Sequence, residues 1–232
     1  MVWLNPVYVL VDFISGFLLY QFIAGFMFLG AALLVYRKAD DNLLTDLWKA
    51  LGAIGIFFLV LASLLYRGKM TGSSVLLSLG YTVPHLSLFV SFAFLWRMVD
   101  SIEMDRWRNG FWAYIVYGAF LTGVGVGEMA PVSVQDGTIV FEDGLFNVLL
   151  PYSIFVGLGA VIILSVLTVS RTEGEDRWRS GMALVGAVSL AALGLFHMIG
   201  ITPLGDIATL LCVAAFTAIG YRETVNRYLG RT

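Results

Sequence analysis

The sequence predicts an all-α membrane protein, a single seven-helix transmembrane bundle over residues 1–232. Hydrophobic residues make up 59% of the chain and charged residues only 13%, whereas an average soluble protein is roughly 25% charged. Apolar stretches close to the roughly 20 residues that cross a bilayer recur along the chain. Because the backbone has no water to bond in hydrocarbon, stretches of this length without strand-like alternation are expected to be helices.

The expected spans are listed by residue number: 13–36, 47–66, 74–96, 111–129, 145–170, 181–199 and 204–221. Lysine and arginine orient them. Only Arg67 and Lys69 fall on one side of the bundle, and the other twelve basic residues fall on the opposite side. The positive-inside rule then puts the N-terminus outside and the C-terminus in the cytoplasm. We therefore expect a multi-pass protein of a prokaryotic-style cell membrane.

The segment 130–144, between the fourth and fifth spans, is expected to form a short outer β-hairpin. Its residues alternate in polarity on both sides of Asp136-Gly137, a pair typical of tight hairpin turns. Glu142 and Asp143 follow, so the hairpin would make a small acidic lid over the outer mouth. A loop that only connects the two helices is the alternative.

A D-x-W-K/R pattern recurs at 46–49, 105–108 and 176–179, where the second, fourth and sixth spans begin. Aspartate suits a helix N-terminus as a cap, and tryptophan and a basic residue suit the cytoplasmic interface. Two origins stay open: duplication of a helix hairpin, or convergent chemistry at the interface.

Five polar residues are candidate ligand-binding residues, because polar groups inside a membrane are costly. Two of them, Tyr81 and His85, flank Pro84 in the third span. Proline frees the carbonyl of Gly80 and bends the helix, so both side chains could line a cavity near the midplane. The alternative is that His85 bonds a neighbouring backbone carbonyl.

The other three candidates are His197, Asp206 and Glu128, at depths of roughly 27, 24 and 30 Å from the cytoplasmic arginines. His197 and Asp206 lie on consecutive helices, and their pairing would make a pH- or ligand-responsive site. A hydrogen bond joining two helices, or two separately hydrated groups, are the alternatives. His85 and His197 differ by roughly 9 Å in depth, which disfavours a bis-histidine haem. Zinc is also disfavoured, and no cofactor is expected.

Thr82-Val83-Pro84 resembles the Thr-Thr-Pro of the third helix of microbial rhodopsins, whose seven-helix order and orientation are also similar. That resemblance implies a receptor-like bundle. A retinal pigment needs a lysine in its seventh helix for a Schiff base, but the only lysines, at 38, 49 and 69, lie near span ends. No retinal is therefore expected. The outline is also similar to the seven-helix sensor domains of prokaryotic signalling proteins.

We therefore expect a sensor or receptor-like module with a small polar site in the outer half of the bundle. The alternatives are a small-solute or proton-coupled transporter, or a membrane enzyme or complex subunit that handles a lipophilic molecule. No recognisable catalytic motif is present, which favours a non-enzymatic role. Expected partners are membrane lipids, a small lipophilic ligand, and a signalling protein or second copy, but no nucleic acid. The single cysteine, Cys212, is predicted to be a buried apolar side chain.

Overall fold

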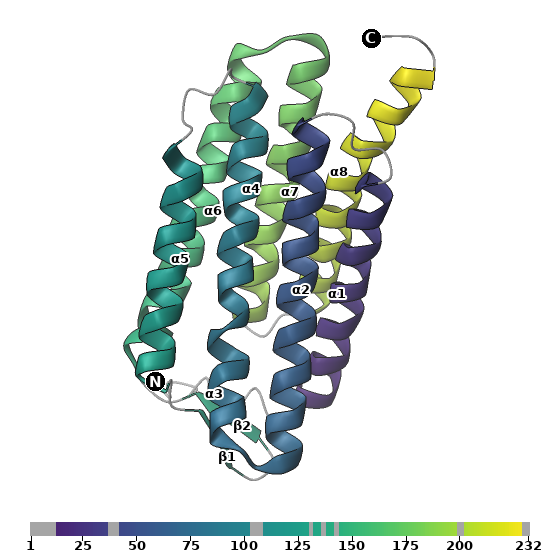
Figure 1. Ribbon diagram of the computed structural model, residues 1–232. Helices are drawn as coiled ribbons and strands as arrows, with labels where there is room; N and C mark the ends of the chain where they lie inside the picture. The colour runs from purple at the N-terminus through teal and green to yellow at the C-terminus, as the bar shows by residue number, and fades with distance from the viewer. Residues whose placement is uncertain are drawn as a thin grey trace, which may run out of the picture.

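The computed structural model describes residues 13–36, 42–102, 109–129, 132–135, 138–141, 144–198 and 202–228. Its helices run alternately up and down in one bundle (Figure 1). They are α1 (Phe13–Tyr36), α2 (Asn42–Thr71), α3 (Ser74–Thr82), α4 (Pro84–Ile102), α5 (Asn109–Gly127), α6 (Leu145–Arg171), α7 (Gly174–Met198) and α8 (Thr202–Tyr228). Within the described residues, seven helical spans are long and apolar enough to cross a membrane, with α3 and α4 sharing one span. The prediction of a seven-helix, multi-pass membrane protein is confirmed.

Several helices extend beyond the apolar stretches that predicted them. α2 begins at Asn42 rather than at 47, and α7 begins at Gly174 rather than at 181. Hydropathy detects only the part of a helix that lies in hydrocarbon, whereas its backbone hydrogen bonds continue into the interface. The prediction that Asp46 caps α2 is therefore wrong, because Asp46 lies one turn inside the helix.

Pro84 divides the third span into α3 and α4. The two helices are joined through Val83, whose backbone N–H donates to the Leu79 carbonyl at 3.0 Å. The Val83 carbonyl in turn accepts from the Leu86 N–H at 3.1 Å, which is a tighter turn than an α-helix makes. The break follows from the missing N–H and the ring of proline, as the sequence predicts.

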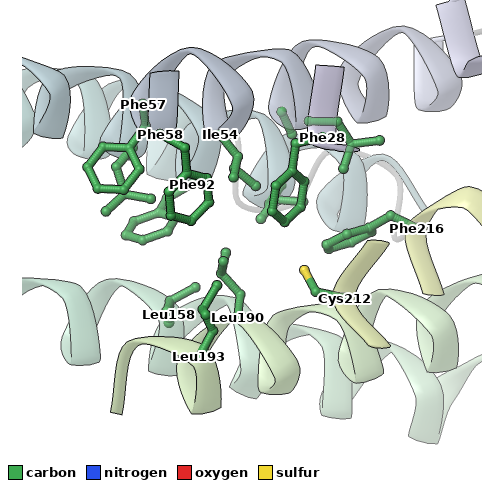
Figure 2. Close-up of a cluster of buried hydrophobic side chains, with 14 of the residues drawn as sticks. Phe28, Ile54, Phe57, Phe58, Phe92, Leu158, Leu190, Leu193, Cys212 and Phe216 are labelled. Carbon is green, nitrogen blue, oxygen red and sulfur yellow. The ribbon is translucent and has the colours of Figure 1, made fainter. Parts of the chain in front are cut away.

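The core of the bundle is formed by large apolar side chains from several helices (Figure 2). Phe28 of α1 stacks on Phe58 of α2 with ring centroids 5.7 Å apart. Between α7 and α8, Gly186 lets the Phe216 ring approach so closely that an added Cβ would lie 2.5 Å from its Cζ. Cys212 is fully buried beside this packing, which confirms that it is a small apolar core residue.

The segment 130–144 contains two short antiparallel strands, β1 (Val132–Gln135) and β2 (Thr138–Phe141). Their register pairs Val132 with Phe141 and Gln135 with Thr138. They lie at the end of the bundle where α3 begins, which we call the hairpin end (Figure 1). The opposite end, where α4 and α6 finish, is called the basic end because it carries Arg97 and Arg171. That the hairpin end faces outward remains a prediction from the charge pattern.

Candidate functional site

His85 is a buried residue at the break between α3 and α4. Its Nδ1 lies 2.6 Å from the carbonyl oxygen of Tyr81. A carbonyl only accepts, so Nδ1 carries the hydrogen of this bond. The rings of Phe57, Tyr81 and Phe146 stand edge-on to the imidazole, with centroids 5.1, 5.4 and 5.7 Å away. This is the backbone-carbonyl bond that the sequence left open as an alternative, enclosed by three aromatic rings.

Glu128 is joined to this aromatic group through α6. Its two carboxylate oxygens accept from the backbone N–H groups of Leu145 and Phe146, each at 3.0 Å. The N-cap residue of α6 is Gly144, which has no side chain to bond these amides. A carboxylate here satisfies two donors that a helix leaves unpaired and suits the positive end of its dipole. Phe146 thus connects Glu128 to His85 and Tyr81, three of the five predicted site residues.

The other two predicted residues lie on α7 and α8. α7 ends at Met198 and α8 begins at Thr202, so His197 and Asp206 are near the same end of consecutive helices. The Asp206 side chain is exposed. The side chain of His197 lies outside the described part of the chain, so its pairing with Asp206 stays a prediction.

The basic end of the bundle contains an ion pair that sequence reasoning missed. Arg97, near the end of α4, donates from Nε to Asp46 Oδ2 at 2.7 Å and from Nη2 to Asp46 Oδ1. Its guanidinium also lies over the rings of Phe94 and Phe111, at 5.1 and 4.9 Å from their centroids. The aspartate of the first D-x-W-K/R motif therefore locks α2 to α4.

A second arginine at this end likewise contacts both an acid and an aromatic ring. Arg222 of α8 lies 3.0 Å from Glu175 Oε2 at the start of α7, and 4.3 Å from the ring centroid of Trp178. In both cases an acid in or beside a D-x-W-K/R motif binds the arginine near the end of the next span. At the two copies that the structure describes, 46–49 and 176–179, an acid in or next to the motif thus joins consecutive spans.

An open space lies between α5 and α6, with α4 behind it. We call this cavity of about 540 Å³ the α5–α6 groove. Its lining is Phe89, Trp96, Gly110, Ala113, Tyr114, Tyr117, Leu149, Tyr152, Ser153, Val156, Gly157 and Ala160. Leu149 and Ala160 are eleven residues apart on α6, which gives the groove a length of about 16 Å. It is therefore an elongated, mostly apolar site that runs along the helices.

Two tyrosines of α5 hold the groove open. Tyr114 donates from its hydroxyl to the carbonyl oxygen of Gly157 on α6 at 2.6 Å. The hydroxyl of Tyr117 lies 2.7 Å from Oγ of Ser153, which is one helical turn before Gly157 on α6. Each side chain reaches from α5 to α6, so the two helices stay a tyrosine length apart at this level.

No single motif in the sequence identifies the groove. The nearest signal is the run of small residues Ser153, Gly157 and Ala160, which lie three or four apart on one face of α6. Such spacing normally lets two membrane helices approach closely. Here the tyrosines of α5 occupy part of that face, and the small residues leave space instead.

Comparison with protein-family models, with curated proteins and with solved structures finds no match. Among the residues that the structure describes, no three His, Cys, Asp or Glu side chains are grouped so that they could hold a metal ion.

Proposed function

We propose that this protein is a receptor-like membrane protein that binds a lipophilic molecule in the α5–α6 groove. The groove carries the proposal: its volume of about 540 Å³ falls within the range of roughly 300–1,000 Å³ typical of ligand pockets. Its lining residues Tyr152 and Val156 are 70% and 73% exposed, so the groove opens on the side of the bundle. In a bilayer that opening faces lipid, and the ligand enters sideways from the membrane.

The charge pattern gives this entry a direction. With the N-terminus outside, the basic end lies at the cytoplasmic face of the cell membrane. Trp96 and Gly110 line the part of the groove nearest that end, and Leu149 lies farthest from it. The ligand then comes from the cytoplasmic leaflet and reaches toward the middle of the bilayer.

The packing behind the groove supports a sensor over a static lipid anchor. The Tyr117 ring packs edge-on against Phe89, with centroids 5.8 Å apart. Phe89 is one helical turn from His85 on α4, and His85 bonds the backbone at the break between α3 and α4. A ligand that packs against the Tyr117 ring therefore acts, through Phe89, on the segment whose backbone is already interrupted, and we propose that the angle between α3 and α4 is the output.

Photo-cross-linking with an alkyl chain that carries a diazirine tests the binding. Labels are expected on groove residues such as Tyr114 and Ser153. Ala113→Phe fills the groove and should remove most of this labelling. Val116→Phe is the matched control, because Val116 lies on the same helix, is 67% exposed and does not line the groove. Equal labelling of the groove in both variants, or labels spread evenly over the lipid-facing surface, would exclude the proposed site.

A further inference from the structure

We propose that the lipophilic ligand is an alcohol, whose hydroxyl donates a hydrogen bond to a tyrosine oxygen in the α5–α6 groove. This inference rests on the proposed function, because it names the chemistry of the molecule bound there. It comes from counting hydroxyl hydrogens. The three hydroxyl groups that tie the groove together are those of Tyr114, Tyr117 and Ser153.

Ser153 decides the direction of the bond to Tyr117. The Ser153 hydroxyl donates to the carbonyl oxygen of Leu149 at 2.6 Å, and a carbonyl cannot donate in return. A serine hydroxyl has a single hydrogen, so Ser153 Oγ can only accept from Tyr117 at 2.7 Å. The hydrogen of Tyr117 is therefore used inside the protein, and its oxygen keeps its lone pairs.

The Tyr114 hydroxyl also uses its hydrogen inside the protein. It donates to the carbonyl of Gly157 at 2.6 Å, so its oxygen is also left as an acceptor. At this level of the groove, Tyr114 and Tyr117 therefore present oxygen atoms that can only accept further bonds. A ligand hydroxyl complements them by donating. At the level of Tyr114 and Tyr117, an ether or ketone would instead place oxygen lone pairs against oxygen lone pairs.

The rest of the groove defines the remainder of the ligand. Its other contacts, such as Val156, Ala160 and the ring of Trp96, are apolar or aromatic, and the length of about 16 Å suits an extended chain. A long-chain alcohol therefore matches both parts of the site. Its chain follows the apolar walls, and its hydroxyl reaches the level of Tyr114 and Tyr117.

Competition between two matched molecules tests the inference. Hexadecanol and hexadecyl methyl ether share a chain and an oxygen, but only the alcohol can donate. Each is added, at equal membrane mole fraction, against the photoreactive alkyl probe. In the wild-type protein the alcohol should compete better by a fewfold to about tenfold, the value of one neutral hydrogen bond. Equal competition by the two molecules would overturn the alcohol assignment and leave the proposed function intact.

Variants then test whether the hydroxyl hydrogen of Tyr117 is used in the bond to Ser153. Ser153→Ala frees the Tyr117 hydrogen to donate to a ligand, so the preference for the alcohol should shrink. Ser165→Ala is the control, because Ser165 lies on the same helix and also donates to a backbone carbonyl, that of Val161 at 2.8 Å, but does not line the groove; it should keep the wild-type preference. A Ser153→Ala protein with the full preference would contradict the count. Failure of the probe to label the groove in wild-type protein would instead overturn the proposed function itself.

Discussion

Two helix hairpins of this protein share a topology and differ in closure. Where α2 packs against α3, Gly80 is so close to α2 that an added Cβ would lie 2.6 Å from the Cβ of Leu64. Between α5 and α6, two tyrosines separate the helices and a cavity of about 540 Å³ remains. In the apolar stretch of α2, 50% of the residues are buried, against 17% in α5. A glycine contact thus closes the α2–α3 hairpin, whereas the α5–α6 hairpin stays open at the level of its tyrosine bridges.

The α2–α4 side of the bundle is also held by an ion pair at its basic end. Asp46 is buried and holds Arg97 in a two-bond pair, which fixes α2 against α4. The pair holds the basic end of α4 against α2, on the far side of α4 from the break at Pro84. We infer that α2 and the basic end of α4 are the frame of the bundle, against which the α3–α4 angle can change, and that the α5–α6 half is the site.

The largest effect is expected from breaking the charge lock. Asp46→Ala leaves the Arg97 guanidinium without its carboxylate. Removing one partner of a fully buried pair costs about 3–5 kcal/mol, and since Arg97 is 39% exposed we expect about 2–3 kcal/mol of lost unfolding free energy. Asp176→Ala is the matched control from the third motif, where an exposed pair with Arg179 contributes under about 0.5 kcal/mol. Unfolding in detergent measures both, and equal losses would refute the lock.

A slightly smaller effect is expected from the glycine contact. Gly80→Ala forces a methyl group against the side chain of Leu64 and the backbone beside it, and overpacking of this kind costs about 1–3 kcal/mol. Gly123→Ala on α5 meets nothing within 4 Å, so its stability should change by less than about 0.5 kcal/mol. If both variants unfold at the wild-type temperature, the α2–α3 contact is not as tight as the structure shows.

The smallest effect is expected from the tyrosine bridges. Tyr114→Phe removes the bond to the Gly157 carbonyl and should cost about 0.5–1.5 kcal/mol. Its effect on binding should be larger than its effect on folding, because the bridge also supplies an acceptor to the groove. Tyr66→Phe, on α2 and outside the groove, serves as the comparison variant. Thermal unfolding and probe labelling, measured together, separate the two roles; a loss of stability without any change in labelling would make Tyr114 a packing residue only.

The sequence predicts the spans well, because the thickness of hydrocarbon sets their length. α1 has the bounds 13–36 that hydropathy predicts, and Pro84 predicts the break between α3 and α4. The partner of Asp46 could not be predicted in the same way. Arg97 is 51 residues away in the chain, whereas the local D-x-W-K/R pattern favours a helix cap.

The candidate site was harder to predict than the fold. His85 and Tyr81 lie together at the helix break, where the imidazole bonds the Tyr81 carbonyl and is enclosed by three aromatic rings, which is the alternative that the sequence left open. The α5–α6 groove depends on how far apart two helices pack. That distance is set by tyrosines that bond across the gap, and a linear pattern of apolar and small residues does not encode it.

The most direct test of the account is native mass spectrometry of the protein extracted gently from its own membrane. The wild-type protein and the Val116→Phe control should carry a bound lipophilic molecule, and Ala113→Phe should lose it, because only that substitution fills the groove. An adduct kept equally by all three proteins would place the molecule elsewhere on the lipid-facing surface and would contradict the central claim.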